Sequence, residues 1–108
     1  MLATVRELCR IGVDAVKLHN LYAVKRTPLA EMVEKGEVEL IRRDDYIRVL
    51  ADALEILPVS MVVERVSGDA PPEYLVGPSW CLDKPAIRKA LDGEFERRNS
   101  WQGKFAAT

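Results

Sequence analysis

Two short runs of β-branched and apolar residues, separated by segments with helical periodicity, constrain the fold of this 108-residue chain more than any other feature. The first run lies within residues 13–22 and the second within residues 59–66. Two strands that alternate with helices of this length are expected to pair in parallel through a right-handed crossover. The pattern predicts an α/β fold. A parallel sheet of only two strands leaves faces and edges to cover, so we interpret the chain as part of something larger.

Four segments are predicted to be helices from apolar periodicity and from residues that begin or end helices. They are residues 3–10, 28–36, 44–57 and a last segment that begins after Asp83. Thr27 and Asp83 are predicted N-caps, because their side-chain oxygens can accept backbone N–H groups. Residues 70–81, which hold three prolines and one glycine, are expected to form an ordered loop. The tail, residues 99–108, is expected to be partly frayed, with Trp101 as its candidate anchor.

Charge and composition exclude several classes of protein. Lys and Arg number 16 against 17 Asp and Glu, so the chain lacks the basic excess typical of phosphate binding, and nucleic acid is not an expected partner. No apolar run reaches the roughly 20 residues that span a bilayer, and the first residues lack the layout of a signal peptide. Two cysteines, Cys9 and Cys81, are too few for a disulfide-rich scaffold. We therefore expect a reduced, cytoplasmic protein without a membrane partner.

Five short motifs, in order along the chain, resemble one family. They are GVDAVKLHNLY (residues 12–22), TPLA (27–30), SGDAP (67–71), WCLDK (80–84) and SWQGK (100–104). Together they resemble the C-terminal part of the YhcC-like radical S-adenosylmethionine (SAM) proteins, relatives of the Elongator-protein-three and coproporphyrinogen-dehydrogenase groups. The resemblance implies that residues 1–66 are the last βα units of a partial TIM-type (β/α)₆ barrel. Residues 67–108 would be a C-terminal loop and helical extension that packs on them as one structural unit.

The same resemblance implies an enzyme whose active site lies outside this chain. Family members hold a [4Fe–4S] cluster through a C-x-x-x-C-x-x-C motif, and the cluster and SAM generate a 5′-deoxyadenosyl radical. No such motif occurs here, and two distant cysteines cannot replace three converging thiolates. We therefore expect no cofactor, catalytic residue or metal ligand within this chain, and we expect the isolated fragment to be inactive. The parent protein would be about three times as long as this chain. The natural partner of the fragment would be the missing N-terminal half of that parent.

Candidate site residues lie where the predicted strands end, since barrel chemistry occurs at the C-terminal ends of strands. Lys17 and His19 share one face of the first strand, which we expect to face the lumen, while Val16 and Leu18 face the helices. The resemblance suggests that this strand contacts SAM or lines the substrate cavity. The candidates on it are Lys17, His19, Asn20, Leu21 and Tyr22, and those on the second strand end are Arg65 and Asp69.

Each candidate also has a structural interpretation. His19 can be a hydrogen-bonded structural residue instead of a ligand contact. Arg65 can clamp a substrate anion, or it can pair with Asp69 or Glu64 and brace the following loop. Asp69 can be a cap or turn acceptor. The function has an alternative as well, because a two-stranded sheet with open edges is also compatible with a non-enzymatic α/β module that docks or forms a homodimer.

Other features have a favoured structural interpretation. We interpret Trp80 as a loop anchor instead of a lid, and Cys81 as buried and inert instead of redox-active. The charged run at residues 94–98 is interpreted as a solvated helix face. Two positions depart from the family pattern. Arg26 stands where a glycine is expected, so the turn must adopt a conformation that a side chain tolerates, and Arg42 stands where a serine N-cap is expected.

Overall fold

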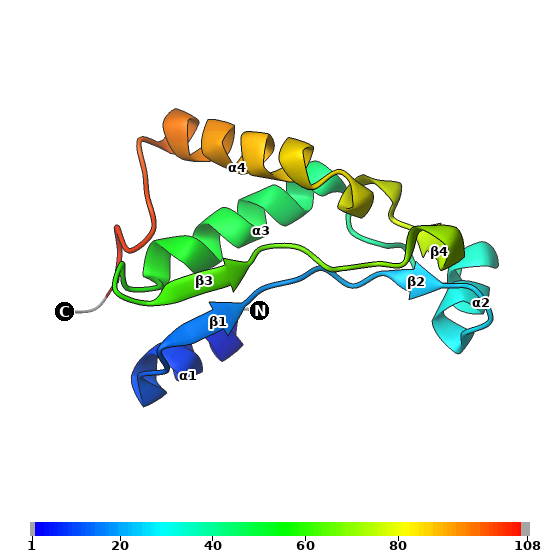
Figure 1. The fold of residues 1–108 in the computed structure, drawn as a ribbon, viewed down its shortest axis with the longest axis horizontal. Helices are drawn as coiled ribbons and strands as arrows, with labels where there is room; N and C mark the ends of the chain where they lie inside the picture. Colours follow the sequence, from blue (N-terminus) through cyan, green and yellow to red (C-terminus); the bar gives the residue numbers. More distant parts are fainter. Residues whose placement is uncertain (1, 107–108) are drawn as a thin grey trace.

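The computed structural model describes residues 2–106, which form an α/β fold with four α-helices and two small sheets (Figure 1). The helices are α1 (Leu2–Ile11), α2 (Pro28–Glu34), α3 (Arg43–Ile56) and α4 (Lys84–Arg98). The strands are β1 (Ala15–Lys17), β2 (Ala23–Val24), β3 (Val62–Arg65) and β4 (Leu75–Gly77), and two 3₁₀ turns are η1 (Pro72–Tyr74) and η2 (Ser79–Leu82). Within the described residues, no helix combines the length and apolar character needed to cross a membrane.

Strands β1 and β3 pair in parallel, which confirms the pairing predicted from the alternation of strands and helices. Ala15 lies opposite Val62, and the ladder extends to a hydrogen bond of 2.8 Å from the Leu18 N–H to the Arg65 carbonyl. The regular part of β1 is only three residues long, shorter than the run that predicted it. Short strands are expected here, because each pairs with only one neighbour among residues 2–106.

The second sheet was not predicted. Strand β4 lies within residues 70–81, which were expected to be a loop, and it pairs antiparallel with β2. The loop prediction is therefore wrong for Leu75–Gly77. The Lys25 N–H donates to the Tyr74 carbonyl over 2.8 Å and continues the contact between the two segments. The prolines at 71, 72 and 78 flank this strand, where a missing N–H removes no hydrogen bond of the ladder.

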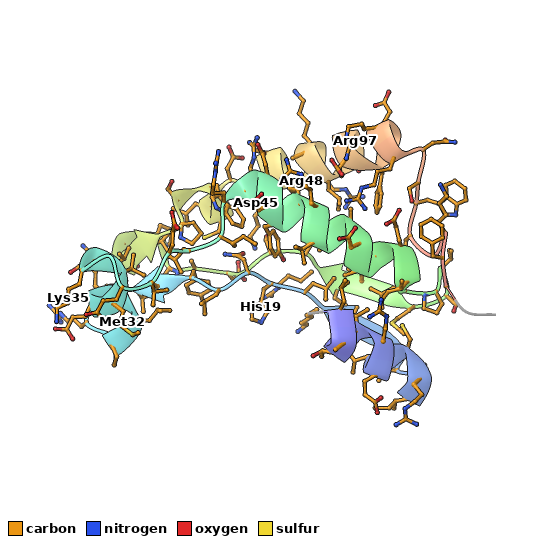
Figure 2. The ribbon with its side chains drawn as sticks, turned by 180° about the vertical axis from the view of Figure 1, so that it is seen from behind. His19, Met32, Lys35, Asp45, Arg48 and Arg97 are labelled. Atoms are coloured by element: carbon orange, nitrogen blue, oxygen red, sulfur yellow. The ribbon has the colours of Figure 1, made fainter. Side chains whose placement is uncertain are left out.

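Helices α1 and α3 lie on one face of the β1–β3 sheet, with α4 packed on α3, while α2 lies beside β2. Figure 2, seen from behind, shows α1 and α3 in front of the strands. Val16 and Leu18 are buried and pack into the same core as Val5, Leu50 and Ile87, which confirms that this face of β1 points toward the helices. Leu50 and Ile87 are fully buried, so α3 and α4 supply the centre of the core.

Local signals at the helix ends are largely confirmed. Thr27 accepts the Ala30 N–H over 3.2 Å, and Asp83 accepts the Ala86 N–H over 3.1 Å, as their N-cap assignments predicted. Arg42 makes no side-chain cap on α3. Arg26 adopts φ 66°, so the turn keeps the left-handed backbone that favours glycine and places an arginine there. That conformation costs a side-chain-bearing residue about 1 kcal/mol.

The structure corrects two predictions for the C-terminal part, one of them only as far as residue 106, because residues 107–108 of the predicted frayed tail lie outside the described residues. The charged run at residues 94–98 is not simply a solvated face, because Arg98 lies between α3 and α4 and binds Asp52 and Glu55 at 2.8 and 2.9 Å. Up to residue 106 the tail is also held in place, since the Gly103 and Phe105 N–H groups donate to the Leu54 and Glu55 carbonyls. We call residues 99–106 the tail strap.

Trp101 does not anchor the tail strap, because its side chain is 54% exposed. Gln102 does so instead, donating from Nε2 to the carbonyls of Pro58 and Met61, each over 2.9 Å. A polar side chain has this role because the turn between α3 and β3 offers backbone carbonyls, and one amide group can donate to two of them.

Candidate functional site

The candidate site lies where β1 and β3 end side by side. Because the two strands are parallel, their carboxyl ends meet at one edge of the sheet, and residues 18–22 and 66–69 leave it together. We call these two segments the strand exits. The last ladder hydrogen bond, from Leu18 N–H to the Arg65 carbonyl, marks where they begin.

The five candidates on β1 and the first strand exit divide between two faces. Lys17, His19 and Leu21 are exposed, with Leu21 60% accessible, while Asn20 is 3% exposed and lies on the helix side with Leu18. This follows the two-residue period of extended chain. Figure 2 shows His19 projecting away from α3. The structure therefore groups Lys17, His19 and Leu21 on the face of the sheet opposite the helices, whereas the Asn20 side chain points toward the helices.

Tyr22 is half-buried against the second strand exit. Its ring lies so close to Gly68 that a Cβ built there would be 2.9 Å from two ring atoms. Glycine at position 68 is therefore needed for close packing, because real Cβ atoms essentially never make such short contacts. Tyr22 thus contributes to the contact between the two strand exits.

Arg65 and Asp69 form an ion pair at 3.5 Å, and Lys84 at the start of α4 binds the other carboxylate oxygen at 2.5 Å. This geometry supports the brace interpretation of Arg65. Lys84, which sequence reasoning did not assign to the site, holds the pKa of Asp69 below its ordinary value, and Arg65 adds to the effect. On the face opposite the helices, Lys17 Nζ also lies 3.9 Å from Glu64 Oε2 on the neighbouring strand.

We expect the Lys84→Met variant to bring the pKa of Asp69 back toward its ordinary value of 3.8. Because the pKa is lower in the folded chain, Asp69 contributes stability above its unfolded pKa, and that contribution is lost as the pH falls through the folded pKa. The measurement is an NMR titration of the Asp69 carboxyl carbon. Lys89→Met, on an exposed position of α4, serves as the control. An unchanged Asp69 titration in Lys84→Met would contradict the assigned brace.

A hollow of about 360 Å³ opens beside the first strand exit. Its lining residues come from the exit, from the segment before α3 and from α3 itself: His19, Asn20, Leu21, Glu39, Leu40, Ile41, Tyr46 and Val49. Sequence reasoning missed the last five, which are distant along the chain from any strand end. An apolar wall with a few polar groups at one side is typical of small-ligand sites.

An aromatic pair supports this wall. Tyr46 and Trp80 stack with ring centroids 5.4 Å apart, and Trp80 Nε1 donates to the Ile41 carbonyl over 3.1 Å. The Tyr46 hydroxyl donates to the Val66 carbonyl over 2.6 Å, and burial raises the pKa of Tyr46 to about 12. Trp80 is therefore an anchor, as interpreted from the sequence. Cys81 is 1% exposed and burial raises its pKa, which confirms the prediction that this thiol is buried.

A model of the radical SAM C-terminal domain matches residues 13–97, which is most of the chain and contains both strand exits. This chain belongs to the radical SAM C-terminal domain family. The resemblance drawn from the five motifs is thereby confirmed. The match begins just before β1 and ends within α4, so it spans the core of the fold and the candidate site.

Relatives of this radical SAM C-terminal domain are considerably longer proteins. It is 39% identical to the uncharacterized protein YtqA of Bacillus subtilis over 97% of this chain, which is 33% of YtqA. It is 34% identical to the uncharacterized protein MJ0486 of Methanocaldococcus jannaschii over 95% of the chain and 32% of that protein. Protein YhcC of Escherichia coli is 31% identical over 77% of the chain and 27% of its own length. The chain spans about a third of the curated relatives that it matches.

The described part of this radical SAM C-terminal domain does not fit an iron–sulfur cluster. Cys9 lies in α1 and Cys81 in η2, and residues 2–106 contain no group of three His, Cys, Asp or Glu side chains that could hold a metal ion. A [4Fe–4S] cluster needs several converging thiolates. Any such cluster of the longer relatives would therefore take its ligands from residues outside this segment.

Proposed function

We propose that this chain is the C-terminal part of a radical SAM enzyme and that its strand exits line the cavity of a partial (β/α)₆ barrel. The observation that carries the proposal is the division of faces along β1. Val16 and Leu18 are buried under the helices, while Lys17, His19 and Leu21 are exposed on the other side. In a βα barrel the helices cover the outside and the opposite face of each strand points into the lumen.

The open edge of β1 also supports a larger barrel. Among residues 2–106, β1 pairs with β3 alone, and a parallel sheet is normally covered at its edges as well as its faces. The relatives are about three times as long as this chain, which leaves enough residues for the remaining βα units. In the proposal this preceding part is the natural partner of the segment.

Residues of the preceding part would hold the [4Fe–4S] cluster, since the described residues do not. When bound together, the cluster and SAM would supply the radical chemistry of the family. The role left for this chain is to bind and orient: Lys17, His19 and Leu21 face the cavity, while Arg65, Asp69 and Lys84 brace its rim. We propose that the isolated 108-residue chain is inactive.

The experiment compares the full-length protein with the isolated segment after anaerobic iron–sulfur reconstitution. We expect a visible iron–sulfur absorption band and reductive cleavage of SAM from the full-length protein, and neither from residues 1–108. In the full-length protein, His19→Ala is expected to weaken SAM or substrate binding about tenfold, the effect of one lost hydrogen bond. Arg88→Ala, on the exposed side of α4, is the matched control. A full-length protein that binds neither iron nor SAM would overturn the proposal.

One observation favours the alternative, an association module that forms homodimers through the β1 edge. Leu21, which follows β1, and Val62, which lies in β3 opposite Ala15, are 60% and 57% exposed, and a second copy of the chain would cover such apolar side chains. Light scattering separates the two proposals. A full-length protein that dimerises through Leu21 and Val62, and loses the dimer in a Val62→Lys variant, would favour the module. A monomer in which Val62→Lys disturbs only SAM binding would favour the barrel.

A further inference from the structure

Asn20 occupies a position where the alternation of β1 calls for an apolar residue. Val16, Leu18 and Asn20 all point to the helix side, and the Asn20 side chain is as well buried as its two apolar neighbours. A buried amide costs free energy unless its polar atoms are hydrogen-bonded. The partners of Asn20 therefore indicate why an amide stands there.

Those partners connect the two strand exits. Asn20 Oδ1 accepts the Gly68 N–H over 3.1 Å, and Nδ2 donates to the Leu21 carbonyl over 3.2 Å. The first bond joins residues 48 positions apart and is buried. The Asn20 side chain also lies beside the thiol of Cys81, a residue of η2. One amide thus contacts the first strand exit, the second strand exit and the segment that covers them.

The contact between the two strand exits leaves no room for a side chain at position 68. A Cβ at Gly68 would lie 2.9 Å from the Tyr22 ring and 3.4 Å from the Asn20 carbonyl oxygen. The two exits therefore touch directly around the Asn20 amide, and a lost hydrogen bond would leave the buried Gly68 N–H unpaired. A substitution that removes the Asn20 amide is therefore expected to move the two strand exits relative to each other.

We propose that Asn20 is a positioning residue: its amide holds the two strand exits in register, so that His19 and Leu21 on the first exit are presented to the cavity and the Asp69 brace keeps its place at the rim. This proposal rests on the proposed function for the identity of the cavity. The positioning role goes beyond the proposed function because it assigns a separate task to Asn20, the one candidate on the first strand exit whose side chain is buried.

The first test uses the 108-residue chain and needs no ligand. In Asn20→Leu, the rate of amide hydrogen exchange is expected to rise about tenfold more at Gly68 than at Leu50 in the core. The reason is that the strand exits would then open locally, without unfolding of the whole chain. The NMR signals of the His19 ring and the Leu21 methyl groups are expected to shift or broaden. Asn20→Asp retains an oxygen acceptor for the Gly68 N–H but sets its second oxygen against the Leu21 carbonyl, so the Gly68 amide is expected to exchange more slowly than in Asn20→Leu and faster than in the wild type.

The control is Val5→Ala, a core substitution in α1. It is expected to lower the melting temperature and to accelerate exchange at Gly68 and Leu50 alike, without moving the His19 and Leu21 signals. Gly68→Ala provides a second perturbation of the same contact, in case Asn20→Leu does not fold, and should move those signals too. If Gly68 and Leu50 change in parallel in both exit variants, Asn20 is an ordinary core residue and the proposal is overturned.

The second test uses the full-length protein with SAM as the probe. Asn20→Leu is expected to raise the dissociation constant of SAM about tenfold, as a misplaced binding group does, while Val5→Ala leaves it unchanged. Full-length wild-type protein that fails to bind SAM would overturn the proposed function, but the exchange experiment would still decide the role of Asn20. SAM binding unchanged in Asn20→Leu, together with unperturbed exits, would overturn the positioning role alone.

Discussion

Replacing Arg98 with methionine is expected to lower the free energy of unfolding by about 3 kcal/mol, because it removes the cation from a cluster of carboxylates that α3 and α4 keep largely out of water. The Arg98 side chain is 19% exposed and its partners Glu55 and Glu94 are 10% and 12% exposed. Burial lowers the pKa of Arg98, but the hydrogen bonds to Asp52 and Glu94 outweigh burial and raise that pKa above its already high ordinary value. The measurement is urea unfolding of the 108-residue chain.

The adjacent arginine provides a matched control for this prediction. Arg97 also binds Glu94, but its side chain is 66% exposed, so Arg97→Met is expected to cost less than about 0.5 kcal/mol. The effect of Arg98→Met should also depend on pH. Arg97 and Arg98 hold the pKa of Glu94 below its ordinary value of 4.5, so the stabilising contribution is present above that pH and is lost as the pH falls through the folded pKa. Equal costs for both arginines would contradict the buried cluster.

Gly103→Ala is expected to destabilise the chain by about 3 kcal/mol, the sum of a left-handed backbone penalty and overpacking. Gly103 has φ 87°, and a Cβ there would lie 2.9 Å from Val59 Cγ2 and 3.2 Å from the Leu57 carbonyl oxygen. Moving away from these atoms would break the hydrogen bond from the Gly103 N–H to the Leu54 carbonyl. The tail strap would then detach from the end of α3.

Gly36 separates the two parts of that cost. Its φ of 74° is similar, but nothing lies within 4 Å of a Cβ placed there. Gly36→Ala is therefore expected to cost only about 1 kcal/mol, the backbone penalty by itself. Thermal unfolding of both variants gives the comparison. Similar melting temperatures for the two would show that the tail strap contributes nothing to stability.

The sequence was sufficient to predict those parts of the fold that depend on local periodicity. The alternation of strands and helices predicted the parallel pairing of β1 with β3, and the two-residue period placed Val16 and Leu18 under the helices. Both follow from hydrophobic burial, which acts on every residue of an element. The N-caps at Thr27 and Asp83 were predictable for a similar reason, since the cap and its partner are three residues apart.

Parts that depend on distant partners could not be predicted. Strand β4 is three residues long and finds its partner about 50 positions earlier, so no periodicity marks it. The run at residues 94–98 has the composition of a solvated face, and only the packing of α4 on α3 places Arg98 beside Asp52. At the site, the strand ends were predictable, whereas Lys84 and the wall of the hollow come from other elements.

The two tryptophans lie in contrasting environments, which gives the molecule a natural fluorescent label for each of two regions. Trp80 is half-buried against Tyr46 beside the strand exits, whereas Trp101 belongs to the tail strap and is exposed to solvent beneath the Lys104 ammonium group. An indole in a shielded site emits at shorter wavelength than one in water. Emission colour can therefore report on the candidate site and on the tail strap separately, without any dye attached to the chain.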